Sequence, residues 1–150
     1  MINRRFQEKS EKSNTNNSYI FIAKESTIDH VRCIRDLGFC YWWKKCGRGE
    51  RHLQIGDIVY LFISDKIHNR VMYRLEVADT NSTRDDVKYW KTKFEPDNSC
   101  FKLQNVSPVY TGTGLTRDEL EMYGIKRQIL SKKLDAKQAA WLESHFVRAK

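Results

Sequence analysis

Proline and long apolar runs are scarce in this chain of 150 residues. It contains only 2 prolines, which sets it apart from proline-rich disordered segments. The longest apolar run is Ile58 to Ile63, far shorter than the ~20 residues that a membrane span requires. Arg4 and Arg5 are not followed by an apolar stretch, as they would be in a secretory signal. We therefore expect a cytoplasmic protein that does not bind membranes.

Motifs for metal binding and catalysis are also missing. None of the cysteine pairs has the Cys-x2-4-Cys spacing of a structural zinc site, although His30 and Cys33 lie three apart. The chain has no Gly-x-Ser-x-Gly elbow, no phosphate-binding Gly-Lys-Ser/Thr loop and no His-Glu-x-x-His. We expect no cofactor, no metal and no catalytic residue. The cysteines are expected to be free thiols, and they are Cys33, Cys40, Cys46 and Cys100.

Positive charge and aromatic residues are abundant instead. Lys and Arg number 27 against 19 Asp and Glu, which gives a net charge of +8, and the chain holds 4 tryptophans. An apolar fraction of 40% in a chain of this length predicts one folded domain. Residues 1–18 are polar and aperiodic, so we expect a flexible segment there and a single domain over 19–150. A basic folded surface favours polyanions, nucleic acid before an anionic membrane.

Local patterns predict an α+β fold. Residues 19–23 are typical of a strand, and a helix is expected next, capped by Ser26 and Gly38. Its predicted apolar stripe consists of Ile28, Val31, Ile34 and Leu37. Residues 58–64 and 71–77 read as a central strand and its hairpin partner, and 101–110 as a late strand.

Two further helices are expected near the end of the chain. Thr116 and Glu119 form a capping box for a short helix that Gly124 ends, and Asp135 begins the last one. The whole order predicts a mostly antiparallel sheet, curled into a small barrel and flanked by helices.

Aromatic residues beside cations are the strongest functional signal. Trp42 and Trp43 are adjacent, so on a strand they would point to opposite faces and only one would be core. Trp90 repeats the pattern in a loop-like region. Rings stack on bases while cations hold phosphates, so this combination is typical of nucleic-acid sites. The nearby cations are Lys44, Lys45, Arg48, Arg51, Lys88, Lys91 and Lys93, and a further concentration lies between Lys126 and Lys137.

These segments, taken in order, resemble the EVE domain of the PUA-like superfamily, to which the YTH and ASCH domains also belong. The resemblance covers residues 19–147. Tyr19 to His30 is similar to the first strand and helix start of that family, and Ile55 to Ser64 to its Gly-Asp turn and buried strand. Lys44 to Arg51 and residues 80–100 depart from the family pattern, so the fold carries over more safely than the pocket.

The resemblance implies a small PUA-like barrel that flips a modified base into an aromatic pocket, with DNA cytosine favoured and RNA as the other option. Trp42 or Trp43 would be a stacking wall, Ser64 a hydrogen-bonding group and Trp90 a lid. Lys44, Lys45, Arg48 and Arg51 would contact phosphates, with Lys88 and Lys91 beside Trp90. A separate nuclease or modification system would act on the bound nucleic acid.

Two other functions stay open at this stage. One is an enzyme of the ASCH type, a ribonuclease or amide hydrolase, although the Gly-x-Lys-x-x-Glu-x-Arg motif of those proteins does not occur in the sequence. The other is a protein-interaction module whose aromatic residues form an apolar surface patch.

Overall fold

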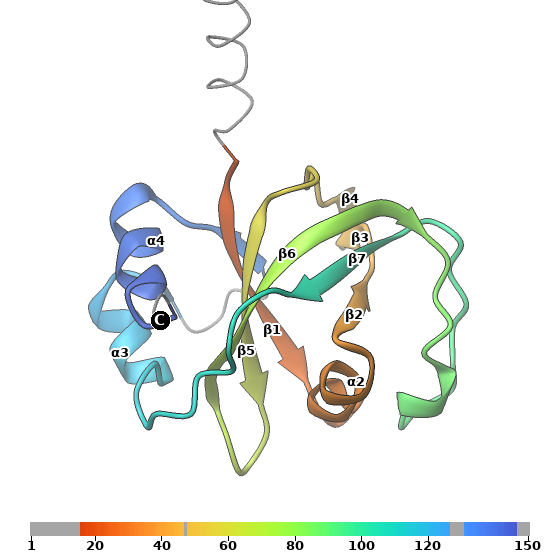
Figure 1. The fold of residues 1–150 in the computed structure, drawn as a ribbon, viewed down its shortest axis with the longest axis horizontal. Helices are drawn as coiled ribbons and strands as arrows, with labels where there is room; N and C mark the ends of the chain where they lie inside the picture. The colour runs from red at the N-terminus through yellow and green to blue at the C-terminus, as the bar shows by residue number, and fades with distance from the viewer. Residues whose placement is uncertain (1–15, 47, 127–130, 147–150) are drawn as a thin grey trace, which may run out of the picture.

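The domain is built on one curved, six-stranded sheet with helices on both faces (Figure 1). The computed structural model describes residues 16–46, 48–126 and 131–146. The strand order is β2-β7-β6-β5-β1-β8, and β3 pairs separately with β4. The strands are β1 (Ser18–Lys24), β2 (Phe39–Trp42), β3 (Lys45–Cys46), β4 (Gly49–Glu50), β5 (Ile58–Ser64), β6 (Arg70–Ser82), β7 (Cys100–Asn105) and β8 (Ser131–Lys133). The helices are α2 (His30–Leu37), α3 (Arg117–Met122), α4 (Ala136–Glu143) and the 3-10 turn η1 (Val87–Tyr89).

Pairing in the sheet is mostly antiparallel, as predicted. Only β1 and β5 run parallel among the strand pairs of the described residues. The β5–β6 hairpin is present, with a register shift between Leu61 and Phe62. The late strand β7 ends at Asn105, before Pro108. The α+β class and the central position of residues 58–64 are thus confirmed.

The continuous apolar run of β5 follows from the burial of both faces of this strand. Alternate side chains of a strand point to opposite faces, and both faces of β5 are covered. Val59, Leu61 and Ile63 enter the core that faces α2, which we call the first core. Tyr60 and Phe62 enter the core that faces α3 and α4, the second core. Figure 1 shows α2 on one side of the sheet and α3 with α4 on the other.

Helix α2 begins later than predicted. Asp29 is its N-cap, with a side chain that accepts from the Arg32 amide, so the cap is not Ser26. The buried face consists of His30, Cys33 and Ile34, whereas the predicted stripe included Leu37, which is exposed. Residue 28 precedes the helix and forms a β-bridge to Trp90. The C-terminal cap at Gly38, with a φ of 82°, is as predicted.

The caps of the two late helices are confirmed with one difference. Asp135 and Gln138 form a full capping box on α4. Thr116 accepts from the Glu119 amide at the start of α3. The Glu119 carboxylate, however, accepts from the amide of Leu115, one residue before the cap. Gly124, with a φ of 83°, follows α3 as expected.

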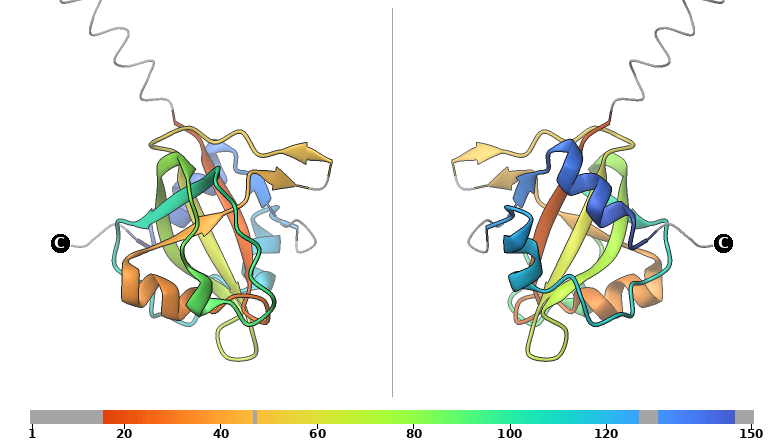
Figure 2. Two further views of the ribbon diagram at one scale, coloured as in Figure 1. Left: turned by 90° about the vertical axis from the view of Figure 1, so that its right-hand side faces the viewer. Right: turned by 90° about the vertical axis from the view of Figure 1, so that its left-hand side faces the viewer.

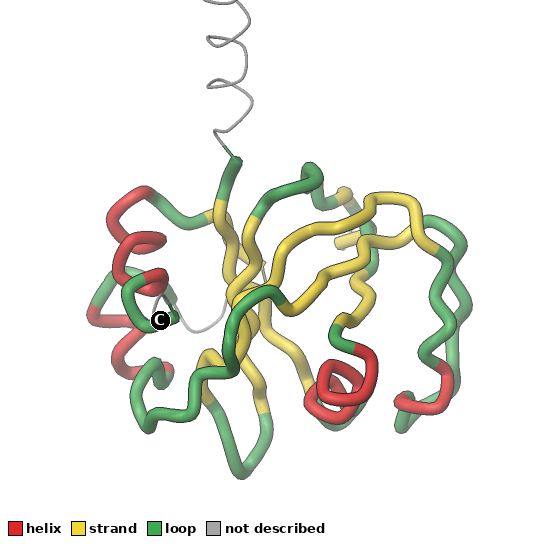
Figure 3. The backbone as a smooth tube through the Cα atoms, viewed as in Figure 1, coloured by secondary structure: helices red, strands yellow, loops and turns green. Residues whose placement is uncertain are grey.

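Three regions add structure that the sequence did not indicate. The basic loop after Trp43 forms the β3–β4 hairpin, which projects from the domain in Figure 2. Strand β8 adds an edge to β1. The segment 83–99, which the sequence left unassigned, runs as a long loop around the α2 side (Figure 3).

The start of the domain is anchored by a buried carboxylate. Asp57, in the predicted Gly-Asp turn, accepts hydrogen bonds from the side chain of Asn16 and the amides of Asn17 and Gln54. Residues 16–18 of the polar N-terminal segment are therefore tied to the turn before β5. The predicted flexibility of residues 1–15 lies outside the described residues.

Candidate functional site

A cavity of about 190 Å³ opens at the predicted tryptophan pair. We call it the tryptophan cavity. It is smaller than the roughly 300–1,000 Å³ of pockets for drug-sized ligands, a size that suits one ring system. Its walls come from the end of β1, the turn into α2, the end of β2 and the residue after β4. The lining residues are Ile22, Lys24, Thr27, Ile28, His30, Trp42, Trp43 and Arg51.

Trp42 forms the inner wall of the cavity. It is the last residue of β2, is 5% exposed, and packs against the rings of Phe21 and His30 at 5.2 and 5.5 Å. Its indole N–H is buried and has no hydrogen-bond partner among the described residues. A buried polar group without a partner is costly, so this N–H is a donor whose need the described residues leave unmet.

Trp43 forms the outer wall of the same cavity. The sequence predicted that the two tryptophans would face opposite sides of a strand. Instead β2 ends at Trp42, so Trp43 lies outside the alternation of the sheet and remains half-buried at the cavity mouth. The result is one core tryptophan and one accessible tryptophan on a single cavity.

The outer wall is supported from behind by a buried cation. The Arg84 guanidinium lies 4.6 Å from the Trp43 ring centre and 5.0 Å from that of Trp90. Asp86 accepts from Arg84 at 2.9 Å and from the Trp90 indole at 3.2 Å. Both side chains of the ion pair are 1% exposed. Trp90 contacts Trp43 edge-on at 5.7 Å and is not among the residues that line the cavity, so it supports the wall, and its role as a lid stays a prediction.

A second polar group, His30, lines the cavity floor. Its Nδ1 lies 2.7 Å from the Glu25 carboxylate, which also accepts from the amides of His30 and Val31. Glu25 is therefore fully used in holding the start of α2. With Nδ1 paired in this way, Nε2 is the ring nitrogen left to face a ligand.

Ser64 does not occupy the role that the resemblance implied. It is at the end of β5, and its side chain is not among the cavity-lining groups. Its carbonyl oxygen accepts from the Glu25 amide at 3.3 Å. Ser64 thus acts through its backbone, by positioning the turn that carries Glu25 and His30.

The predicted phosphate contacts separate into two groups. Arg51 lines the cavity and donates to the carbonyls of Trp43 and Lys45 at 2.9 and 2.8 Å. Lys44 is held elsewhere, since its ammonium donates to Asn81 and Ser99.

The remaining predicted cations surround the site without lining the tryptophan cavity. Lys45 and Arg48 are exposed on the β3–β4 hairpin. Lys88 and Lys91 are exposed on the η1 segment, where the Lys91 amide donates to Thr27 at the cavity edge.

Sequence reasoning missed several groups that the fold brings to this site. Lys24 and Thr27 line the cavity, and Arg84 with Asp86 supports its wall. The position of Lys24 at the end of the first strand was a usable signal, because strand ends often carry functional side chains. Nothing in the local sequence marks Arg84, which reaches the tryptophans only through the long loop.

The cysteines whose side chains the structure describes are buried within the fold. Cys33, Cys40 and Cys100 are buried free thiols, and burial raises the pKa of Cys33 to about 12. In residues 16–46, 48–126 and 131–146, no three His, Cys, Asp or Glu side chains gather as a metal site would require. Within the same ranges, no helix is long and apolar enough to cross a membrane.

Comparisons with known proteins define the fold class. No protein-family model matches the chain, and no curated protein matches it either. Solved structures of very low sequence identity share its α+β fold. A hypothetical protein from Leishmania major aligns with a TM-score of 0.57 and 14% identity over 86% of this chain and 93% of its own. A protein from Pseudomonas putida aligns with a TM-score of 0.55 and 10% identity over 85% and 97%.

A YTH domain from Zygosaccharomyces rouxii, solved in complex with N6-methyladenosine RNA, is also similar. It aligns with a TM-score of 0.48 and 16% identity over 89% of both chains. Because this score is below 0.5, we take neither fold nor ligand from it.

Proposed function

We propose that this protein is a nucleic-acid-binding domain that receives a single base in the tryptophan cavity. The observation that carries the proposal is the indole of Trp42, which lines the cavity and has a buried N–H without a partner among the described residues. A nucleobase offers the two features that this wall can use, a flat face for stacking and a polar edge for hydrogen bonds.

Each wall of the cavity has a separate role in this proposal. Trp43 stacks on the face of the base, and the Trp42 N–H and His30 Nε2 recognise its polar edge. Lys24 and Arg51 at the cavity give the positive field that attracts the phosphate backbone. Extruding a base from a duplex costs a few kcal/mol, so a base that is already unpaired enters more easily.

The finer proposal is that the base is modified and that the protein binds without cutting. The resemblance to EVE domains favours a modified cytosine in DNA, with a modified base in RNA as the alternative. The carboxylate of Glu25, which contacts the cavity-lining His30, accepts three hydrogen bonds at the start of α2, which supports a positioning role and not acid–base chemistry. A separate nuclease or modification system would then act on what this domain binds.

Binding of short single-stranded oligonucleotides tests the proposal. DNA with 5-methylcytosine and RNA with N6-methyladenosine are compared with their unmodified counterparts by fluorescence anisotropy. Trp43→Ala should weaken binding by about 1–3 kcal/mol, or roughly 5- to 150-fold, because one base loses its stacking partner. Trp42→Phe keeps a ring and removes the N–H, and should cost roughly 2- to 13-fold.

Trp141→Ala is the matched control, since Trp141 packs against the second core and stacks on the exposed Tyr123, away from the tryptophan cavity. It should bind like the unaltered protein. Unchanged affinity in both cavity variants would contradict the proposal, and equal affinity for modified and unmodified strands would contradict modified-base reading. Protein-dependent cleavage of the RNA would favour the enzyme alternative.

A further inference from the structure

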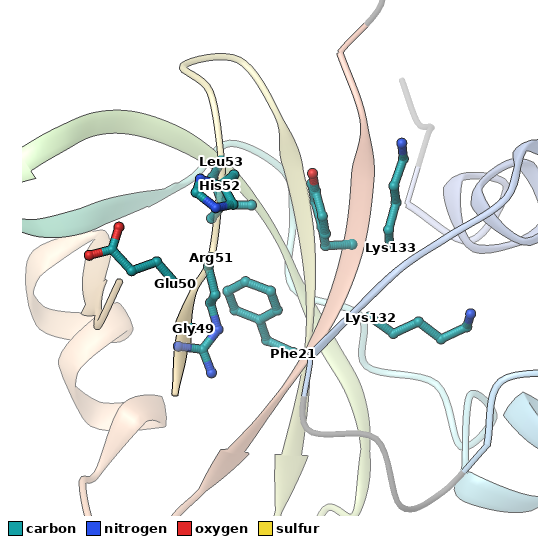
Figure 4. A pocket seen from close by; sticks show the side chains of 9 residues that line it. Phe21, Gly49, Glu50, Arg51, His52, Leu53, Lys132 and Lys133 are labelled. Atoms are coloured by element: carbon teal, nitrogen blue, oxygen red, sulfur yellow. The ribbon is translucent and has the colours of Figure 1, made fainter. Parts of the chain in front are cut away.

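A second cavity of about 290 Å³ lies beside the tryptophan cavity, and the two share Arg51. It lies between the β1–β8 edge of the sheet and the segment that follows the β3–β4 hairpin (Figure 4). We call it the edge cavity. Its lining residues are Tyr19, Phe21, Gly49, Glu50, Arg51, His52, Leu53, Lys132 and Lys133.

The edge cavity is positively charged. Lys133 of β8 lines one side and Arg51 the other, whereas the side chain of the adjacent Lys132 points away from Arg51 and Phe21 in Figure 4. Lys133 forms no ion pair with the described residues. Glu50 is the one carboxylate among the lining residues, and in Figure 4 it points away from the Phe21 ring. Such a rim has the chemistry of an anion site.

Arg51 connects the two cavities rigidly. Its guanidinium lies 5.3 Å from the Phe21 ring centre and donates to the carbonyls of Trp43 and Lys45. The Arg51 side chain therefore forms a rigid wall between the two cavities. A ligand that occupies both cavities passes over Arg51, and a chain in which rings alternate with anions fits this arrangement.

From this arrangement we propose that the edge cavity holds the phosphodiester next to the base in the tryptophan cavity. The ligand is then a single strand that passes over Arg51, with Lys133 holding its backbone and Tyr19 offering a half-buried ring to the neighbouring base. Cations that follow the backbone beside aromatic rings are the usual means of holding single strands. This inference rests on the proposed function and adds the path and strandedness of the ligand.

The test is the salt dependence of oligonucleotide binding by the variant Lys133→Gln. Each phosphate contact to a single strand contributes about 0.7 to the slope of log K against log salt concentration, so the slope should fall by about 0.7. Affinity at low salt should fall about 1.4- to fivefold. The preference for modified over unmodified strands should persist, because phosphate contacts carry no base information.

Lys66→Gln is the matched control, since it removes the same charge from an exposed position outside both cavities. Its slope should stay close to that of the unaltered protein. Thermal melting followed by circular dichroism verifies that both variants are folded.

The binding results distinguish failure of this inference from failure of the proposed function. If Trp43→Ala weakens binding but Lys133→Gln changes neither slope nor affinity, the edge cavity is not a phosphate site. Lys133 then only protects an exposed sheet edge from pairing with other chains. An equal loss of slope in the control variant overturns the inference as well. If no oligonucleotide binds at all, both proposals fall.

Discussion

The residue that organises the candidate site most strongly is Arg84, although it touches no cavity. It is buried among the rings of Trp43 and Trp90 and paired with Asp86. A buried ion pair is weak evidence for stability in itself, but removing one partner leaves a buried charge without compensation. Arg84 is therefore a positioning residue for the outer wall.

Replacing this arginine should destabilise the fold. We expect Arg84→Met to lower the free energy of unfolding by about 3–5 kcal/mol, because Asp86 would stay buried without its cation. Urea unfolding measures the change. Arg35→Met is the control, since the Arg35–Asp36 pair has a 68% exposed arginine and exposed pairs contribute about 1 kcal/mol or less. Similar losses in the two variants would contradict the positioning role.

Single residues also show where sequence reasoning fails. The tryptophan pair was found because aromatic residues beside cations are visible locally. The sequence did not show that the two tryptophans share one cavity, because this depends on β2 ending at Trp42. Ser64 was given a side-chain role, while the structure uses its carbonyl, and backbone roles leave no mark on residue type.

Among the elements, α4 is joined to the sheet by a polar contact. The Glu143 carboxylate accepts from the Tyr60 hydroxyl and, at 2.8 Å, from Arg74 Nε. Partial burial raises the pKa of Glu143, but these hydrogen bonds outweigh it and bring the pKa below the ordinary glutamate value of 4.5. Because the folded-state pKa is lowered, the contact stabilises the fold above that value and is lost as pH falls through the lowered pKa.

Glu143→Gln should therefore be less stable than the unaltered protein at neutral pH, with a smaller loss of stability on acidification. Urea unfolding between about pH 7 and pH 3 measures both effects. Glu95→Gln, an exposed position in the long loop, should follow the unaltered protein throughout. A parallel pH dependence for Glu143→Gln and the unaltered protein would refute the assignment.

The sequence predicted best the elements that are long or that depend on signals from neighbouring residues. The run at β5 and the caps at Thr116 and Asp135 were visible because they depend on neighbouring residues. The two-residue strands β3 and β4 and the three-residue β8 are too short for a periodic pattern. Helix α2 was expected too early, because Glu25 holds the preceding turn through its contacts with His30.

At the scale of the whole molecule, the two cores lie on opposite faces of the sheet. The tryptophan cavity belongs to the face of the first core, whereas α3 and α4 cover the other (Figure 1). Part of the net charge of +8 is concentrated at one place in the fold, since Arg51 and Lys133 both line the edge cavity. The sequence showed these concentrations of charge, but it did not show that the fold brings residues from them close together.

The separation of the two faces predicts that stability and binding can be changed independently. Leu142 is fully buried in the second core, so Leu142→Ala should cost about 2–5 kcal/mol in urea unfolding. Oligonucleotide affinity should stay unchanged at temperatures where circular dichroism shows a folded variant. Loss of binding by the folded variant would mean that the two faces are coupled.

The parallel pairing of β1 with β5 also affects the order in which the chain can fold. Parallel neighbours cannot be joined by a short turn, and the intervening residues 25–57 carry most of the wall of the tryptophan cavity. The β5–β6–β7 meander needs only nearer contacts, so it can form before that long loop closes. The cavity is then completed late in folding. A ligand can bind only chains in which the cavity is complete. By mass action, it therefore shifts the folding equilibrium toward the native state.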